Sequence, residues 1–140
     1  MIVAIRISGP IKLKASIEET LSRLRLKRKF SCVVFKPTKE NIGMINKVRD
    51  FVAYGEVKKE TFEKLIEKRG QLIDKKKKID PKRIYDEIEN GKKYVDLNLK
   101  PFFRLHPPRG GMDVKRGFGD KKGVLGNNKE HINKLLERML

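Results

Sequence analysis

The first 57 positions of the chain contain three short runs of apolar and β-branched residues. They occupy positions 2–7, 31–36 and 51–57, and Pro37 directly follows the second run. Runs of about four to eight such residues, bounded by turn residues, are typical of strands that are largely buried in a sheet. The pattern therefore predicts three strands, separated by two longer segments with a different spacing.

Apolar residues in these two segments recur with the spacing of one face of a helix. In the first segment Ser16 and Glu19 have the spacing of a capping box, so a helix start is expected at Ser16. In the second segment Thr38 is expected to cap the helix N-terminus. Residues 1–57 are thus predicted to form a β-α-β-α-β core of the α+β class. The apolar helix positions are Ile17, Leu21, Leu24, Ile42, Ile45 and Val48.

Residues 58–140 are predicted to form a helical extension of this core. One helix is expected to end at Gly70, and another to begin after Asp80, with a proline at its first position, and to end at Gly91. Asn128 is expected to cap a last helix. The apolar face of that helix comprises Ile132, Leu135, Leu136 and Met139.

The segment 102–126 stands apart from the rest of the extension. It holds 6 of the 11 glycines, 6 basic residues and 2 acidic residues, so we expect a basic loop rich in glycine and proline. A loop of this length inside a small domain is either functional or disordered. Its composition cannot bury a core alone, so we expect it to be partly disordered when free and to become ordered on binding.

The charge of the chain narrows the kind of partner. Its 35 Lys and Arg against 18 Asp and Glu leave a net charge of +17. Residues 1–57 carry 12 basic and 5 acidic residues, 58–101 carry 14 and 9, and 102–140 carry 9 and 4, so the folded body itself is basic. A polyanion offsets this self-repulsion most simply. An anionic membrane would require a basic amphipathic helix with large apolar anchors or a lipidation signal; neither stands out, and Trp is absent.

The sequence contains no transmembrane run and no secretory signal, so a cytoplasmic location is expected. The single Cys32 rules out an intramolecular disulfide and a multi-cysteine zinc site. Because Cys32 lies in an apolar run, it is expected to be a small buried residue.

The end of the first predicted helix is one candidate binding surface. One or two cations there would merely complement the helix macrodipole. Five in seven residues, on a chain already short of acids, favour contacts with phosphates. The candidate residues are Arg23, Arg25, Lys27, Arg28 and Lys29, with Lys47 on the second helix.

The second candidate surface is the glycine-rich segment. Its proline pair stiffens the backbone, while Gly110 and Gly111 allow positive φ and close approach to another backbone. Arginine forks can bind phosphates or guanine edges, and Phe103 and His106 can stack on unpaired bases. The alternative is a mobile loop whose charges are simply solvated. The candidate RNA-binding residues are Arg104, His106, Arg109, Lys115, Arg116, Lys121 and Lys122.

A catalytic reading finds little support in the sequence. His106 with Asp113, or His131, could form a general acid–base pair, but only the residue types suggest it. The chain contains no phosphate-cradling glycine motif, metal-binding histidine pair or nucleophile elbow. We therefore expect no enzymatic activity, no cofactor, no metal and no small-molecule substrate.

Several segments resemble a known family. Residues 21–30, 43–48 and 51–56 are similar to the universal large-subunit ribosomal protein numbered thirty in bacteria and seven in eukaryotes. The EKRG and LHPPRGG sequences, at 67–70 and 105–111, resemble its archaeal branch. The resemblance implies a three-stranded antiparallel sheet of order 3-1-2 with two helices on one face, like a truncated ferredoxin fold. It also implies binding to large-subunit ribosomal RNA without catalysis, and it suggests a place near 5S RNA.

Charge, pattern and resemblance together predict a structural RNA-binding protein of the large ribosomal subunit. Its expected partners are large-subunit ribosomal RNA and neighbouring ribosomal proteins. A regulator or RNA chaperone outside the ribosome is the first alternative, and an enzyme acting on RNA through His106 is a more distant one.

Overall fold

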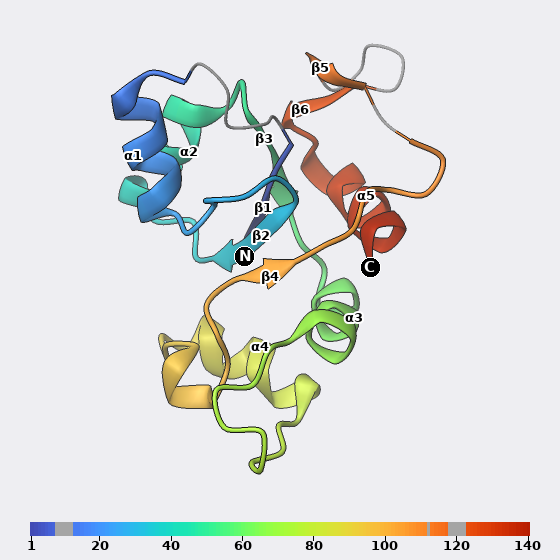
Figure 1. Cartoon of the computed structure of the whole chain (residues 1–140). Coiled ribbons are helices and arrows are strands. Elements are labelled where there is room, and N and C mark those ends of the chain that lie inside the picture. The colour runs from blue at the N-terminus through green and yellow to red at the C-terminus, as the bar shows by residue number, and fades with distance from the viewer. Residues whose placement is uncertain (8–12, 112, 118–122) are drawn as a thin grey trace.

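In the computed structural model, the described residues of the chain form a sheet of six strands, in the order β4-β2-β1-β3-β6-β5 (Figure 1). The structure describes residues 1–7, 13–111, 113–117 and 123–140. The strands are β1 (Ile2–Arg6), β2 (Ser31–Phe35), β3 (Val52–Glu56), β4 (Phe103–Arg104), β5 (Asp113–Gly117) and β6 (Gly123–Asn127).

The three strands predicted from the apolar runs form the centre of this sheet. β1 lies between β2 and β3 and is antiparallel to both, with Ala4 opposite Val33 on one side and Tyr54 on the other. The α+β class and the 3-1-2 order of a truncated ferredoxin fold are therefore confirmed. The strand directions came from the family resemblance and not from the apolar pattern.

The sheet is larger than the three strands expected, because the described parts of residues 103–127 contribute three more. β4 pairs antiparallel with β2 at one edge, β6 pairs parallel with β3 on the other side, and β5 follows β6. Short strands thus occur where a loop was expected. They pair with main-chain groups that β2 and β3 would otherwise leave exposed at the edges of the sheet.

One face of the sheet is covered by α1 (Ala15–Arg23) and α2 (Lys39–Val48), as predicted (Figure 1). Leu21 and Leu24 from α1 and its end pack there with Ile45 and Val48 from α2, so the apolar faces assigned to both helices are buried. Ile17 is only half-buried, and Ile42 is 40% exposed.

The starts of these two helices differ in how well local signals predicted them. The hydroxyl of Thr38 accepts a hydrogen bond from the main-chain N–H of Asn41 at 3.2 Å, which confirms the predicted cap of α2. The capping box at Ser16 is wrong. Lys14 precedes α1, no side chain caps it, and Ser16 lies inside its first turn.

The extension covers the opposite face. α3 (Lys59–Arg69), α4 (Pro81–Glu89) and α5 (Ile132–Met139) form the larger apolar cluster with side chains of β1, β2 and β3. This larger cluster therefore crosses residue 57 and joins the first 57 residues to the extension. The predicted apolar face of α5 is confirmed, since Ile132, Leu135, Leu136 and Met139 are buried.

The ends of the extension helices were mostly predicted correctly. At the start of α4, the carboxylate of Asp80 accepts a hydrogen bond from the main-chain N–H of Lys82. Gly70 follows the last residue of α3, and α4 ends shortly before Gly91, which has a positive φ. The side chain of Asn128 does not cap a helix. It donates to the carbonyl oxygens of Val124 and Gly126, before the short 3-10 helix η2 (Lys129–His131) that leads into α5.

Candidate nucleic-acid interface

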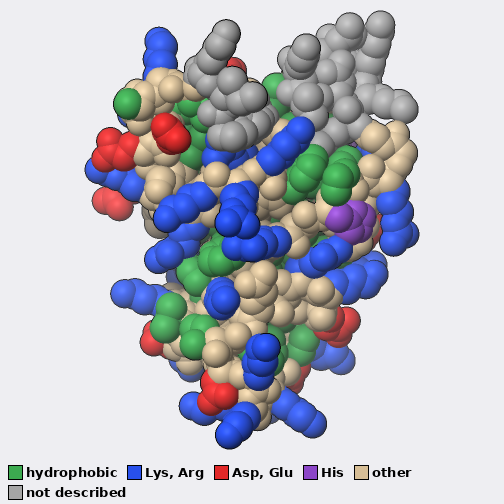
Figure 2. All heavy atoms as spheres, in the orientation of Figure 1, with side chains coloured by type: hydrophobic (Ala, Val, Ile, Leu, Met, Phe, Trp, Pro, Cys, Tyr) green, Lys and Arg blue, Asp and Glu red, His purple; other side chains and the backbone are tan. Residues whose placement is uncertain are grey.

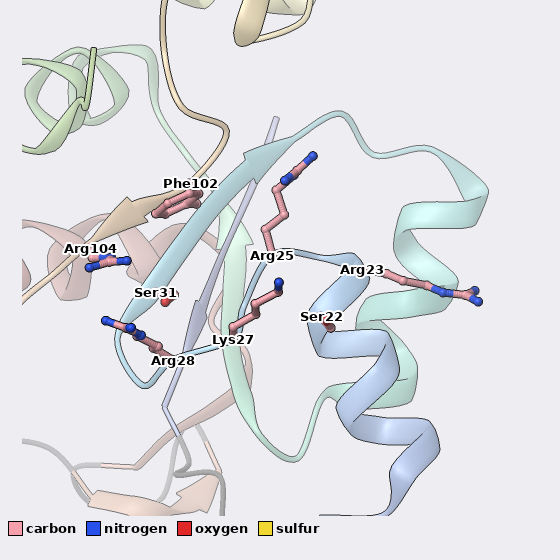
Figure 3. Close-up of a pocket in the computed structure, with 8 residues that line it drawn as sticks. All are labelled: Ser22, Arg23, Arg25, Lys27, Arg28, Ser31, Phe102 and Arg104. Atoms are coloured by element: carbon pink, nitrogen blue, oxygen red, sulfur yellow. The ribbon is translucent and has the colours of Figure 1, made fainter. Parts of the chain in front are cut away.

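A basic cavity of about 500 Å³ lies between the end of α1, the connection from α1 to β2, and the edge strand β4 (Figure 3). Five of its lining residues are cations, and none of the lining residues that the structure describes is acidic. We call this the basic cavity. It is lined by Ser22, Arg23, Arg25, Lys27, Arg28, Ser31, Phe102 and Arg104.

Strand pairing creates this cavity by joining two segments that are distant in the sequence. Ser31 of β2 lies opposite Arg104 of β4, which brings Arg104 beside the basic residues that follow α1. Because side chains alternate along a strand, Arg104 and Phe102 lie on the same face as Ser31. Further along the sheet, α1 and α2 cover this same face. At the edge of the sheet, β4 therefore forms the floor of the basic cavity.

The connection that follows α1 has a tightly defined backbone. The N–H of Arg25 bonds to the carbonyl of Ser22, and the N–H of Leu26 bonds to the carbonyl of Leu21. This pair of bonds is the Schellman ending of a helix, in which the residue after the cap adopts the left-handed conformation. That residue is usually glycine, but here Arg25 takes it, with φ of 63°. A strained conformation thus directs an arginine side chain at the basic cavity.

Arg6 holds this connection against the sheet from below. It is only 2% exposed, and its Nη1 donates to the carbonyl oxygens of Leu26 and Lys27 at 2.8 and 2.9 Å. Its own carbonyl accepts from the N–H of Phe30. Burial lowers the pKa of the Arg6 guanidinium, and the nearby charge of Glu18 partly opposes this effect. Arg6 therefore acts as a positioning residue that fixes the loop bearing Lys27.

Three lining residues were not predicted from the sequence, and the role expected of one aromatic residue is wrong. Phe103 was expected to stack on bases, but it is fully buried on the other face, edge-on to the ring of Tyr94 at 6.2 Å. The neighbouring Phe102 lines the cavity instead. Ser22 and Ser31 were missed as well. Alternation along a strand at 102–104 would have distinguished Phe102 from Phe103, but a strand was not expected there.

Among the thirteen predicted RNA-binding residues, the structure brings five together in the basic cavity. These are Arg23, Arg25, Lys27, Arg28 and Arg104. Arg23 points away from Phe102 and pairs with Glu19 at 2.7 Å in an exposed ion pair, so it is the least available of the five (Figure 3). Lys29 is exposed close by, with its Nζ 5.2 Å from the Phe30 ring centroid.

The remaining predicted residues lie elsewhere. Lys47 is exposed on α2. Both ring nitrogens of His106 face main-chain oxygens, those of Pro107 and Leu140. The main-chain N–H of the exposed Arg109 donates to the carbonyl of Arg138 in α5, and the side-chain Nε of Arg138 donates to the carbonyl of Arg109. For Lys115 and Arg116 only the backbone, within β5, is described. Lys121 and Lys122 lie outside the described residues.

The segment 105–111 is tied to α5 through its main chain. The N–H groups of His106 and Arg109 donate to the carbonyls of Met139 and Arg138, and Arg138 donates back to the carbonyls of Arg109 and Gly111. Gly110 and Gly111 adopt positive φ of 81° and 75°, which confirms the expectation from the sequence.

The chemistry available at the basic cavity is that of binding. Figure 2 shows Lys and Arg side chains gathered across the middle of the molecular face on which α1 and β4 lie. Arginine forks and lysine ammonium groups contact phosphate oxygens, and an aromatic face can stack on a base. Within the described ranges there is no cluster of three His, Cys, Asp or Glu that could hold a metal ion. None of the helices described is long and apolar enough to cross a membrane.

Comparison with known proteins points to one family. The profile of the family "Ribosomal protein L30p/L7e" matches residues 2–52. A protein of Archaeoglobus fulgidus named large ribosomal subunit protein uL30 is 39% identical, and the alignment covers 99% of each chain.

Two further archaeal proteins with the same name are similar to the chain over nearly its whole length. The one from Methanococcus maripaludis is 37% identical, with 97% of each chain covered. The one from Methanopyrus kandleri is 38% identical, with 94% of this chain and 99% of the relative covered. The family resemblance seen in the sequence is therefore confirmed, and the chain belongs to the L30p/L7e family of ribosomal proteins.

Proposed function

We propose that the chain is a structural constituent of the large ribosomal subunit that binds ribosomal RNA through the basic cavity. One observation carries this proposal. The pairing of β2 with β4 gathers Arg25, Lys27, Arg28 and Arg104 from two distant segments around the side chain of Phe102, and the described lining residues include no carboxylate. Members of a ribosomal protein family bind ribosomal RNA in general, so this surface is the natural place for it.

The cations would act mainly on RNA phosphates. Each phosphate that a cation neutralises releases condensed counterions, so the affinity should fall steeply as salt is added. The buried Arg6 and the Schellman ending hold the loop before RNA arrives, which reduces the entropy lost on binding. Lys29, next to the cavity, would add a further phosphate contact.

Other surfaces would complete the contact with the ribosome. Lys47, His106, Arg109, Lys115, Arg116, Lys121 and Lys122 remain candidate RNA contacts outside the basic cavity. The family resemblance also suggests a place near 5S RNA, and neighbouring ribosomal proteins as partners. Membership in a family of ribosomal structural proteins agrees with the expectation that the chain is not an enzyme, and it implies a cytoplasmic location on the ribosome.

Binding of the purified chain to large-subunit ribosomal RNA tests this proposal. The affinity should fall by orders of magnitude between about 50 and 200 mM salt. The double change Arg25→Gln, Arg28→Gln should weaken binding strongly. The control Lys75→Gln, Lys76→Gln removes the same charge from an exposed turn outside the cavity and should have a smaller effect.

Two results would contradict the proposal. Equal losses from the two double variants would mean that charge acts diffusely and the cavity is not the interface. A chain that fails to sediment with the large subunit after a high-salt wash, while still binding RNA, would favour a regulator or chaperone outside the ribosome.

A further inference from the structure

The floor of the basic cavity holds an aromatic ring that phosphate binding does not explain. Phe102 is half-buried rather than sealed in the core, and Arg104 lies two residues further along the same face of β4. The Cζ of Arg104 is 5.7 Å from the Phe102 ring centroid, within the range of a cation–π contact. Figure 3 shows Phe102 and Arg104 together at one end of the cavity, beside β4.

Three other lining cations come from a different part of the chain. Arg25, Lys27 and Arg28 belong to the connection after α1, which forms a second wall of the cavity; Figure 3 shows Arg25 and Lys27 on the side toward α1 and Arg28 closer to Arg104. A ligand that satisfies both walls must present a flat surface to β4 and negative charge to the connection. The lining hydroxyls of Ser22 and Ser31 add groups that can donate or accept hydrogen bonds between the two walls.

The volume of the cavity favours a ligand larger than one phosphate. About 500 Å³ falls within the range of about 300 to 1,000 Å³ that pockets for small organic ligands occupy. A regular RNA helix keeps its bases stacked and has a deep, narrow major groove, so it would lay only its backbone across the rim. An unpaired nucleotide can turn its base outward and fill the space.

We propose that the basic cavity receives one unstacked nucleotide of an RNA bulge or internal loop. Its base stacks on Phe102 and is held there by the Arg104 guanidinium, while the flanking phosphates contact Arg25, Lys27 and Arg28. Stacking on an aromatic face is available to every base, so recognition depends on an unpaired nucleotide more than on its identity. This inference rests on the proposed function, since it specifies the RNA feature that the same cavity binds.

The test uses three RNA hairpins of equal length that differ at one position. In the first, the stem carries a single bulged 2-aminopurine; in the second, this base is paired; in the third, the bulge is abasic. Affinity is measured by anisotropy at one salt concentration, and the transfer of the base from the RNA to the cavity by the change in 2-aminopurine fluorescence. The full-length chain should bind the bulged hairpin about tenfold more tightly than the other two and change the fluorescence of the bulged base.

Two substitutions separate stacking from charge. Phe102→Leu keeps an apolar side chain without the flat ring, so it should abolish the tenfold preference for the bulged hairpin over the paired and abasic ones. Phe102→Tyr keeps the ring and should retain the preference. Circular dichroism of both variants establishes that they are folded; if Phe102→Leu does not fold, the comparison of bulged and abasic hairpins with the unaltered chain still decides.

The inference would be overturned if the bulged, paired and abasic hairpins bound equally, or if the abasic bulge bound as tightly as the one with a base. In either case the cavity would bind backbone alone. Such a result leaves the proposed function standing, provided that the chain still sediments with the large subunit and its affinity for ribosomal RNA depends on Arg25 and Arg28.

Discussion

The contact between β3 and the last helix is so close that a single methyl group should break it. Gly55 is buried in β3, and a Cβ placed on it would lie 2.3 Å from the carbonyl oxygen of Lys129 and 2.9 Å from Cγ2 of Ile132. The Lys129 oxygen belongs to the main chain, so it cannot move aside as a flexible side chain can. Gly55→Ala must therefore displace η2 and the start of α5.

Displacing these elements would disturb a connected set of hydrogen bonds. The N–H of Asn128 donates to the carbonyl of Tyr54, and the side chain of Asn133 bonds to Glu56 and Lys58 at the end of β3. Overpacking costs about 1 to 3 kcal/mol, and a main-chain obstacle favours the upper end. Replacing glycine by alanine also reduces the conformational freedom of the unfolded chain, which by itself raises the free energy of unfolding by about 0.4 to 1 kcal/mol. The net loss of unfolding free energy should be about 2 kcal/mol.

Gly43→Ala is the matched control, since it adds the same methyl group where space is open. Gly43 is exposed within α2, and a Cβ there would meet nothing within 4 Å. Alanine is favoured over glycine inside a helix by about 0.5 to 1 kcal/mol, so this variant should be more stable than the parent chain. Urea unfolding followed by circular dichroism measures both changes. If Gly55→Ala were as stable as the parent, α5 would not pack on β3 as described.

Three further predictions concern the cavity and the core. Arg25→Gly should raise the free energy of unfolding by up to about 1 kcal/mol, because glycine adopts the positive φ without strain, and it should weaken RNA binding. Arg25→Gln should weaken RNA binding without stabilising the fold. Equal stability of the two variants would refute the backbone strain at position 25. Arg6→Met should lower the free energy of unfolding in urea by about 2 to 3 kcal/mol, because it leaves two carbonyl oxygens without their donor. The same change should lower the RNA affinity although Arg6 is buried. An unchanged RNA affinity would exclude a positioning role for Arg6. Burial raises the pKa of the Cys32 thiol, so iodoacetamide should alkylate it at about pH 8 only in denaturant; rapid reaction of the folded chain, followed by mass spectrometry, would contradict its burial.

The sequence by itself determined the central strands and helices of this protein. Branched apolar runs and helical spacing depend on neighbours close in the chain, so the pattern located β1, β2, β3 and the helices to within a few residues. Thr38 was predicted correctly because a cap is a bond between residues three positions apart. Ser16 offered the same kind of signal and was misleading, since α1 begins before it. The charge of the chain also pointed to RNA without any structure.

Only the tertiary structure decided where the basic residues meet. β4 is two residues long, β5 (Asp113–Gly117) has a single large apolar residue and β6 (Gly123–Asn127) contains two glycines, so none shows an alternation that a sequence pattern could reveal. These strands exist because β2, β3 and then β6 offer main-chain groups for pairing, which is a property of the folded sheet. The same pairing buries Phe103 and leaves Phe102 in the cavity. Adjacent residues thus receive opposite roles from a contact about 70 positions away, between Cys32 and Phe103, that no local rule encodes.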